Sequence, residues 1–192
     1  MRAILTILAL ALASCGGGNT PSPSPSGGWT FAYSNNVSGS CDAFNFPNQD
    51  GVHYYVKPMV VKAGQTITMS LSLSGNGSLV PSSDSPPATM HLFLQRKGDD
   101  LSCVGALQQY RYWSTAVVRL NVPGSYTLTS PVSPDKWTDC YGKSGADHPA
   151  EFQGAVNNLS TIGYTFGGAN FSGHGVYANG SVRFQLISYS VQ

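Results

Sequence analysis

Aromatic and polar side chains that could bind a sugar gather near the middle of the chain. The run of residues 110–113 (YRYW) places three aromatic rings beside the guanidinium of Arg111. Gln95 and Asp99 precede it, in a strand-like run and the turn that follows, and a hairpin would bring them close to Tyr110. Aromatic rings stack on the apolar faces of sugars, while Arg, Gln and Asp side chains hydrogen-bond hydroxyl groups. The cluster therefore indicates a carbohydrate-binding surface.

Trp137 is the aromatic residue that we expect to be most exposed. It lies in the loop-rich segment 131–145, and its neighbours include Asp135, Lys136 and Asp139. Such polar surroundings are typical of the surface, whereas Trp113 and Tyr110 have burial in the core as an open alternative. The candidate ligand-binding residues are Trp137, Trp113, Tyr110, Arg111, Gln95 and Asp99.

Groups that could catalyse a reaction are scarce. Glu151 is the only glutamate, and no second carboxylate stands at a spacing that indicates a glycosidase pair. The chain has no GxSxG or HExxH motif. Ser172 and His174 stand two residues apart in a glycine-rich loop, where we expect His174 to hydrogen-bond the loop backbone. We therefore expect a protein that is not an enzyme.

No metal or cofactor is expected. Zinc is disfavoured because there is no CxxC motif and no His lies within four positions of a Cys. Several aspartates could offer oxygen ligands to a structural calcium, but they lack the spacing of a calcium loop and are typical of solvated turns. These aspartates are Asp42, Asp50, Asp99 and Asp100.

The N-terminus has the anatomy of an export signal. Arg2 supplies a positive charge, an apolar stretch follows that is too short to span a bilayer, and Leu12-Ala13-Ser14-Cys15 ends it. Leu-Ala-Ser-Cys resembles the lipobox of bacterial lipoproteins. The resemblance implies that residues 1–14 are removed and that Cys15 is acylated, which anchors the protein to a lipid bilayer. The alternative is an ordinary secretory signal.

Residues 15–28 follow the signal as a Gly, Pro and Ser tether that cannot bury a core. The folded domain is then expected over residues 29–192. Gly16 is not the Asp that often retains lipoproteins in the inner membrane, so the outer membrane is favoured if the source is Gram-negative.

Three cysteines remain once Cys15 is assigned to lipid: Cys41, Cys103 and Cys140. In an oxidising compartment an odd number indicates one disulfide and one free thiol. All three pairings stay open. We favour Cys103 with Cys140, because both lie in polar loops.

Periodicity predicts an all-β domain. Apolar residues alternate with polar ones in most segments, and only residues 149–159 have helical spacing. In the last strand the alternation slips by one residue, which predicts a β-bulge near Leu186 and Ile187 and a central place in a sheet. The expected strands lie near residues 29–33, 53–61, 66–73, 90–95, 110–122, 126–128, 161–166 and 181–191.

These strands and one short helix predict a two-sheet antiparallel β-sandwich of jelly-roll type. The short helix, the strand after it, the glycine-rich loop and the C-terminal strand resemble the galactose-binding-like jelly rolls of carbohydrate-binding modules. The resemblance implies a non-catalytic domain that binds glycans, although no binding residue of those families maps onto this chain.

The leading hypothesis is a membrane-anchored lipoprotein that binds a carbohydrate of the cell envelope or its surroundings. Only 10% of the residues are charged, and the net charge of +1 leaves no basic stripe for nucleic acid. The alternative is a protein-interaction lipoprotein: an adhesin, an envelope-assembly factor or a prophage exclusion factor. A concave site with aromatic and polar groups would favour sugar, and an exposed apolar patch would favour a protein partner.

Overall fold

The computed structural model describes residues 28–32, 37–40 and 42–192, and the predicted signal, Cys15, Cys41 and most of the tether lie outside them. The strands are β1 Thr30–Ala32, β2 Ser38–Ser40, β3 Ala43–Asn45, β4 Tyr54–Lys57, β5 Thr66–Gly75, β6 Ser78–Pro81, β7 Thr89–Arg96, β8 Arg111–Arg119, β9 Gly124–Pro131, β10 Trp137–Thr138, β11 Leu159–Gly167, β12 Val176–Asn179 and β13 Val182–Val191. The helices are α1 Pro149–Val156 and the short 3-10 helices η1 Gly105–Tyr110, η2 Pro134–Lys136 and η3 Gly145–Asp147.

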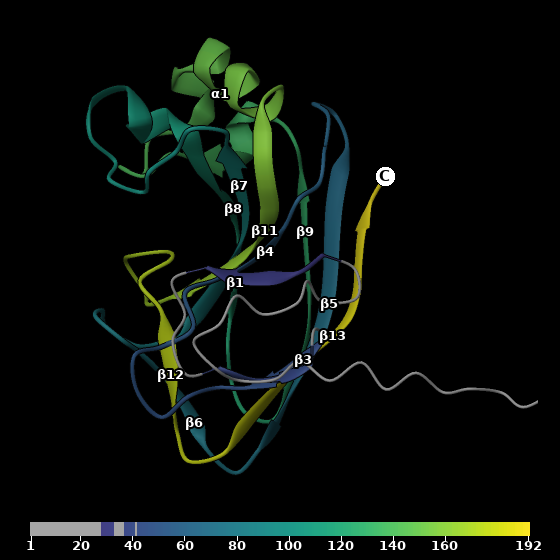
Figure 1. Cartoon of the computed structure of the whole chain (residues 1–192), viewed down its shortest axis with the longest axis vertical. Helices are drawn as coiled ribbons and strands as arrows, with labels where there is room; N and C mark the ends of the chain where they lie inside the picture. The colour runs from purple at the N-terminus through teal and green to yellow at the C-terminus, as the bar shows by residue number, and fades with distance from the viewer. Residues whose placement is uncertain (1–27, 33–36, 41) are drawn as a thin grey trace, which may run out of the picture.

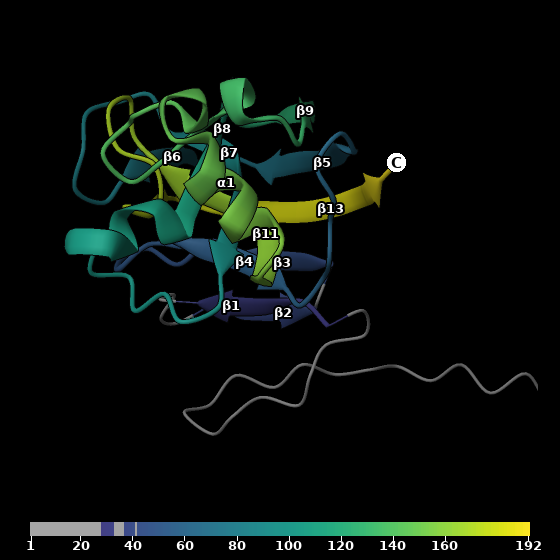
Figure 2. The same cartoon turned by 90° about the horizontal axis from the view of Figure 1, so that it is seen from above.

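The strands form two large antiparallel sheets and a small one. The six-stranded sheet has the order β1-β4-β11-β7-β8-β10, and the five-stranded sheet has the order β2-β3-β13-β5-β9. Strands β6 and β12 pair separately, at the end of the molecule opposite α1 (Figure 1). Seen from the α1 end, the helix crosses over β7 (Figure 2). The domain is the predicted all-β sandwich.

Eight of these strands follow the wrapping of a jelly roll. In chain order they are β3, β4, β5, β7, β8, β9, β11 and β13. Strand β3 pairs with β13, β4 with β11, β5 with β9 and β7 with β8, so the pairs nest from the ends of this order towards its middle. Successive pairs alternate between the two sheets. This wrapping brings β4, β11, β7 and β8 side by side although they are distant in sequence, and these strands carry the site described below.

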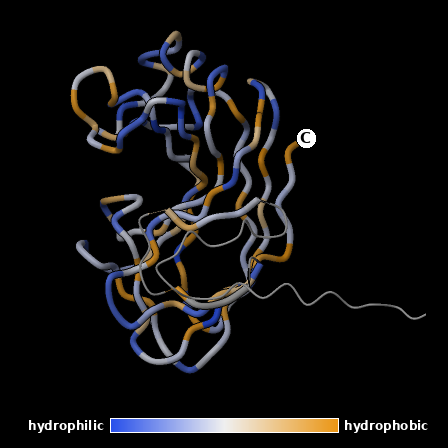
Figure 3. The backbone as a smooth tube through the Cα atoms, in the orientation of Figure 1, coloured by the Kyte–Doolittle hydropathy of each residue, from blue (hydrophilic) through white to orange (hydrophobic). Residues whose placement is uncertain are grey.

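The main core lies between the sheets. In β5, Ile67, Met69 and Leu71 are buried and alternate with half-exposed polar residues, as a strand with one face against a core requires. Colouring by hydropathy shows hydrophobic and hydrophilic residues interspersed along the chain (Figure 3). The core is rich in stacked or tilted aromatic pairs, including Phe44 with Phe184 at 4.6 Å between ring centroids.

A second, smaller apolar cluster lies on the other face of the six-stranded sheet. Tyr54, Val56, Phe93 and Trp113 are buried there, whereas their chain neighbours such as Tyr55 belong to the main core. Adjacent strand residues point to opposite faces, so this cluster is on the outer face of the sandwich. An outer sheet face is commonly polar and solvated. Because these rings are buried, other segments of the chain must cover this part of the outer sheet face.

The predicted bulge and helix are both present. The pairing of β13 with β5 shifts register between Leu186 and Ser188, Ile187 is left exposed, and Tyr189 again packs on the core. Strand β13 lies in the middle of its sheet, as expected. The helix starts at Pro149 and ends at Val156, shorter than predicted because β11 already begins at Leu159.

Candidate functional site

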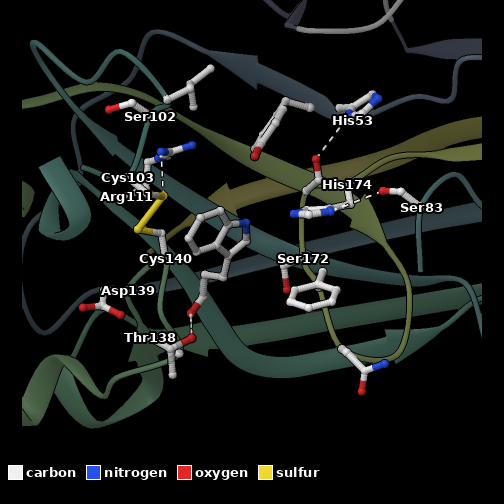
Figure 4. Close-up of a pocket in the computed structure, with 17 residues that line it drawn as sticks. His53, Ser83, Ser102, Cys103, Arg111, Thr138, Asp139, Cys140, Ser172 and His174 are labelled. Atoms are coloured by element: carbon white, nitrogen blue, oxygen red, sulfur yellow. Dashed lines mark hydrogen bonds between the residues drawn. A yellow bond between two sulfur atoms is a disulfide. The ribbon is translucent and has the colours of Figure 1, made fainter. Parts of the chain in front are cut away.

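A pocket of about 820 Å³ opens on the outer face of the six-stranded sheet. Its floor includes Tyr54 of β4 and Trp113 of β8, and Phe93 of β7 links the two rings at centroid distances of 5.0 and 5.6 Å. Two groups of loops form its walls. Figure 4 shows the Cys103–Cys140 disulfide, Thr138 and Asp139 on one side, with Ser83, Ser172 and His174 on the other.

The first wall is the glycine-rich loop between β11 and β12. His53 shares a hydrogen bond of 3.0 Å between Nδ1 and the carbonyl of Gly173. Gly173 and Gly175 have φ angles of +79° and +87°, and a side chain at either would collide with Tyr54 or His53. The glycines therefore let the loop lie directly against β4.

Asp84 fixes the shape of this loop. Its carboxylate accepts hydrogen bonds from the backbone amides of Ser85, Asn170 and Phe171 and from the side chain of Asn170, at 2.6 to 3.0 Å. Desolvation alone would raise the pKa of Asp84, but these hydrogen bonds outweigh it and lower the pKa to about 2. The carboxylate is therefore charged at neutral pH and holds the loop tip in place.

The loop presents an aromatic ring to the pocket. Phe171 is 54% exposed, and its ring stacks on the imidazole of His174 with 5.1 Å between centroids and 20° between planes. His174 in turn lies 3.3 Å from Ser83, measured from Nδ1 to Oγ. The expected bond from His174 to the loop backbone is absent from the hydrogen bonds of the described residues, and His53 takes that role.

The second wall is held together by a disulfide. Cys103 and Cys140 are bonded, which confirms the favoured pairing. The Tyr141 hydroxyl also donates to the carbonyl of Cys103 at 2.9 Å. These two links join the segment before η1 to the segment after β10, so the wall has a defined position relative to the floor.

Four of the predicted ligand-binding residues come together behind this wall. Arg111 lies opposite Gln95 in the pairing of β7 with β8, so the expected hairpin is present. Arg111 forms an ion pair of 3.2 Å with Asp99, and Gln95 donates to Asp99 at 2.8 Å. Arg111 also donates to the Cys103 sulfur at 2.8 Å and lies 5.9 Å from the Trp113 ring.

These residues divide between the pocket and its support. Trp113 and Arg111 line the pocket, whereas Gln95 and Asp99 lie outside the lining and bond to each other. Tyr110 also lies outside it, because its ring stacks on the guanidinium of Arg96 at 4.4 Å. The polar atoms of Gln95 and Asp99 are thus engaged within the protein.

The expectation that Trp137 is exposed is wrong. Trp137 begins β10, pairs with Ser114 of β8, and is 0% exposed within the main core. Its indole nitrogen donates to the carbonyl of Pro131 at 2.7 Å. Polar neighbours in sequence do not decide exposure here, because alternate residues of a strand point to opposite faces. Trp137 therefore stabilises the core and does not face a ligand.

Phe171 is the residue that sequence reasoning missed. It is the one large apolar residue in the run GGANFSGHG, and the neighbouring residues of that run are small or polar. An aromatic side chain inside a glycine-rich loop is a signal that could have identified it, because such a loop rarely buries a ring on its own.

The described part of the chain contains no cluster of three or more His, Cys, Asp or Glu residues that could hold a metal ion. None of the helices in that part is both long enough and apolar enough to cross a membrane. Comparison of the chain with protein-family models, with curated proteins and with solved structures finds no match. Its function is therefore argued from the geometry of the pocket.

Proposed function

We propose that this protein is a membrane-anchored lipoprotein that binds a carbohydrate in the pocket on the outer face of the six-stranded sheet. The observation that carries the proposal is the exposed Phe171 ring in a wall otherwise rich in hydroxyl, amide and imidazole groups. An aromatic face attracts the C–H face of a sugar ring, and the surrounding polar groups can hydrogen-bond its hydroxyls.

The rigidity of the loop supports the same function. Asp84, His53 and the stacking of Phe171 on His174 hold the ring in one position before any ligand arrives. A preorganised site loses less conformational freedom on binding, which raises affinity. A mobile phenylalanine would lose more conformational entropy on binding, and the affinity would be lower.

The proposal is for binding without catalysis. Glycosidases of the common type place two carboxylates on either side of the scissile bond. Asp139 is the carboxylate among the lining residues, and its Oδ1 accepts from the amides of Tyr141 and Lys143. Oδ1 of Asp139 is thus held by the backbone of its own loop.

The anchor is proposed from the sequence. Leu12-Ala13-Ser14-Cys15 and the tether after it support acylation of Cys15. If this holds, the full chain partitions into the detergent phase of a Triton X-114 extraction and incorporates labelled palmitate. The Cys15→Ser variant should do neither, and equal partitioning of both proteins would contradict the anchor.

A binding screen tests the proposed pocket. The purified full chain is applied to immobilised polysaccharides and peptidoglycan, together with Phe171→Ala and Ile187→Ala. Ile187 is the matched control, because it is an exposed apolar residue (62%) on β13 of the other sheet. We expect Phe171→Ala to weaken binding about five- to tenfold, since stacking by one aromatic ring contributes about 1–1.5 kcal/mol.

Two outcomes would count against the proposal. Equal loss with Ile187→Ala would show that the effect is not local to the pocket. Absence of binding by a folded chain would direct attention to a protein partner, which crosslinking in cells would then identify.

A further inference from the structure

The charges around the pocket restrict the class of ligand, and this inference rests on the proposed function. Among the residues that line the pocket, Arg111 and Asp139 carry a formal charge when histidine is neutral. The other lining residues offer hydroxyl, amide, imidazole, aromatic and aliphatic groups and the disulfide. The composition of the walls is therefore polar without being ionic.

Neither charge is accessible to a ligand. Arg111 is only 4% exposed, and its guanidinium is already engaged by Asp99 at 3.2 Å and by the Cys103 sulfur at 2.8 Å. The positive charge is thus neutralised by a carboxylate whose own side chain is fully buried. An anionic ligand would have to displace Asp99 to reach it.

Asp139 is kept from a ligand by burial. It is 3% exposed, and one carboxylate oxygen accepts from two backbone amides of its own loop. Burial raises the pKa of Tyr112, and the negative charge of Asp139 adds to that rise. Tyr112 belongs to the main core, so the charge of Asp139 acts on the interior of the protein.

The accessible groups of the walls are uncharged donors and acceptors. The exposed ones include the hydroxyls of Ser83 and Ser102 and the amide of Asn170, beside the ring of Phe171. Hydroxyl and amide groups match the hydroxyls of a sugar. They do not offset the free energy that a carboxylate, sulfate or phosphate loses when it leaves water. Such an anion requires a paired cation in the site.

We infer that the pocket selects neutral sugar residues and rejects glycans carrying uronic acid, sulfate or phosphate groups. The exposed ring of Phe171 supplies the stacking face, and the hydroxyl and amide groups around it supply hydrogen bonds. Electrostatic attraction contributes little to the affinity, so binding is insensitive to salt.

Matched pairs of polysaccharides test this inference with the full chain. The probes are dextran with dextran sulfate, hydroxyethyl cellulose with carboxymethyl cellulose, and methyl-esterified with de-esterified polygalacturonate. Binding is measured at pH 8, where histidine side chains are commonly neutral. We expect the affinity for the neutral member of a bound pair to exceed that for the anionic member by about tenfold or more. The affinity for the neutral member should change less than about twofold between 20 and 500 mM NaCl.

Adding one cation to the wall provides the converse test. Ser102→Lys places an ammonium among the lining residues, and Ser125→Lys adds the same charge on β9 of the other sheet as the matched control. Circular dichroism confirms that both variants are folded. We expect Ser102→Lys, but not Ser125→Lys, to gain affinity for the anionic member of the pair, and the gain should disappear in high salt.

The outcomes separate this inference from the function on which it rests. Salt-sensitive preference of the unaltered chain for an anionic probe would overturn neutral selectivity and leave carbohydrate binding standing. Failure to bind either member of every pair, and every other glycan of the screen, would overturn both.

Discussion

Asp84 is the residue on which the shape of the glycine-rich wall depends. Its carboxylate is the common acceptor for the amides of Ser85, Asn170 and Phe171, and it receives the Asn170 side chain as well. Removing an acceptor shared by several donors leaves each donor without its partner. The position of Phe171 is therefore set by a residue that lies far from it in the sequence.

Asp84→Ala should weaken the proposed glycan binding while the chain stays folded. The loop tip loses its acceptors, so Phe171 is no longer preorganised, and we expect the affinity to fall by about tenfold. Calorimetric titration measures the affinity, and near-UV circular dichroism reports on the core. Unchanged affinity in a folded variant would show that Asp84 does not position the site.

The pKa of Asp84 also predicts how binding responds to acid. Because its pKa is lowered from 3.8 to about 2, the folded state favours the charged form. Its contribution is complete above about pH 4 and is lost as the pH falls from 3.8 towards 2. In Asp84→Ala this acid-dependent loss should be absent, which a titration of loop resonances by NMR can follow. Loss of the loop structure already at pH 5 would contradict the assignment.

Trp137 has a structural role that mutation should reveal. The side chain is fully buried and its indole nitrogen is hydrogen-bonded to Pro131. Trp137→Ala should lower the free energy of unfolding by about 3–5 kcal/mol, because it leaves a large cavity and an unpaired carbonyl. Ile187→Ala, at an exposed position, should change it by less than about 0.5 kcal/mol. Urea unfolding of both variants gives the comparison.

At the scale of elements, the irregular pairing of β7 with β8 positions the floor of the pocket. The register shifts between His91 and Phe93, so that residues 114–116 of β8 stand opposite the single residue Leu92. The Ser114 hydroxyl accepts from the amide of Leu92 at 3.0 Å, while the His91 ring bonds to the Ser114 carbonyl at 2.8 Å. Ser114 thus bonds to both neighbouring residues of β7 at the bulge, and Trp113 lies directly before it.

His91 should make the stability of this strand pair depend on pH. Burial lowers its pKa from 6.5, although the hydrogen bond to Ser114 opposes the shift. A lowered pKa means that the unfolded chain binds the proton more readily than the folded one. Stability is therefore retained above pH 6.5 and falls as the pH drops below it.

Urea unfolding between pH 5 and pH 8 measures this dependence. The His91→Gln variant has no titrating group at position 91, so its free energy of unfolding should vary less over the same pH range. If the unaltered chain and the variant have parallel profiles, another group is responsible.

At the scale of the whole molecule, the jelly-roll wrapping and the disulfide assemble the pocket from distant segments. Its lining is contributed by residues 53–54, 83, 101–103, 111, 113, 138–140, 142 and 170–174. The disulfide joins cysteines that are 37 residues apart. A cross-link of this span restricts the unfolded chain and holds one wall in place.

Replacing both Cys103 and Cys140 by alanine should therefore lower stability and binding together. We expect the free energy of unfolding to fall by about 2–4 kcal/mol, because the unfolded chain regains the freedom of the loop. Unfolding in urea with and without reductant measures the effect. The double variant should be insensitive to reductant, and a sensitive double variant would mean that another disulfide contributes.

The local pattern of the sequence was sufficient for the longer strands and for α1, whereas the short strands β3, β6, β10 and β12 lie in segments that it predicted as turns or loops. Alternation in residues 66–73 predicted a strand with one buried face, and the slip after Leu186 predicted the bulge that leaves Ile187 outside. Both features depend on the geometry of a single strand, which repeats every two residues. Helical spacing after Pro149 likewise identified α1, because a helix repeats about every 3.6 residues.

The site needed the tertiary structure. Trp137 and Phe171 both stand among polar or small residues, yet Trp137 is buried against another strand and Phe171 is exposed at the rim of a pocket. The pairing of Gln95 with Arg111 followed from a hairpin, a short-range feature, but Asp84 and Asn170 meet across 86 residues. Composition and periodicity report which face of its own element a side chain occupies. Only the wrapping of the whole chain decides what covers that face, and therefore which residues a ligand can reach.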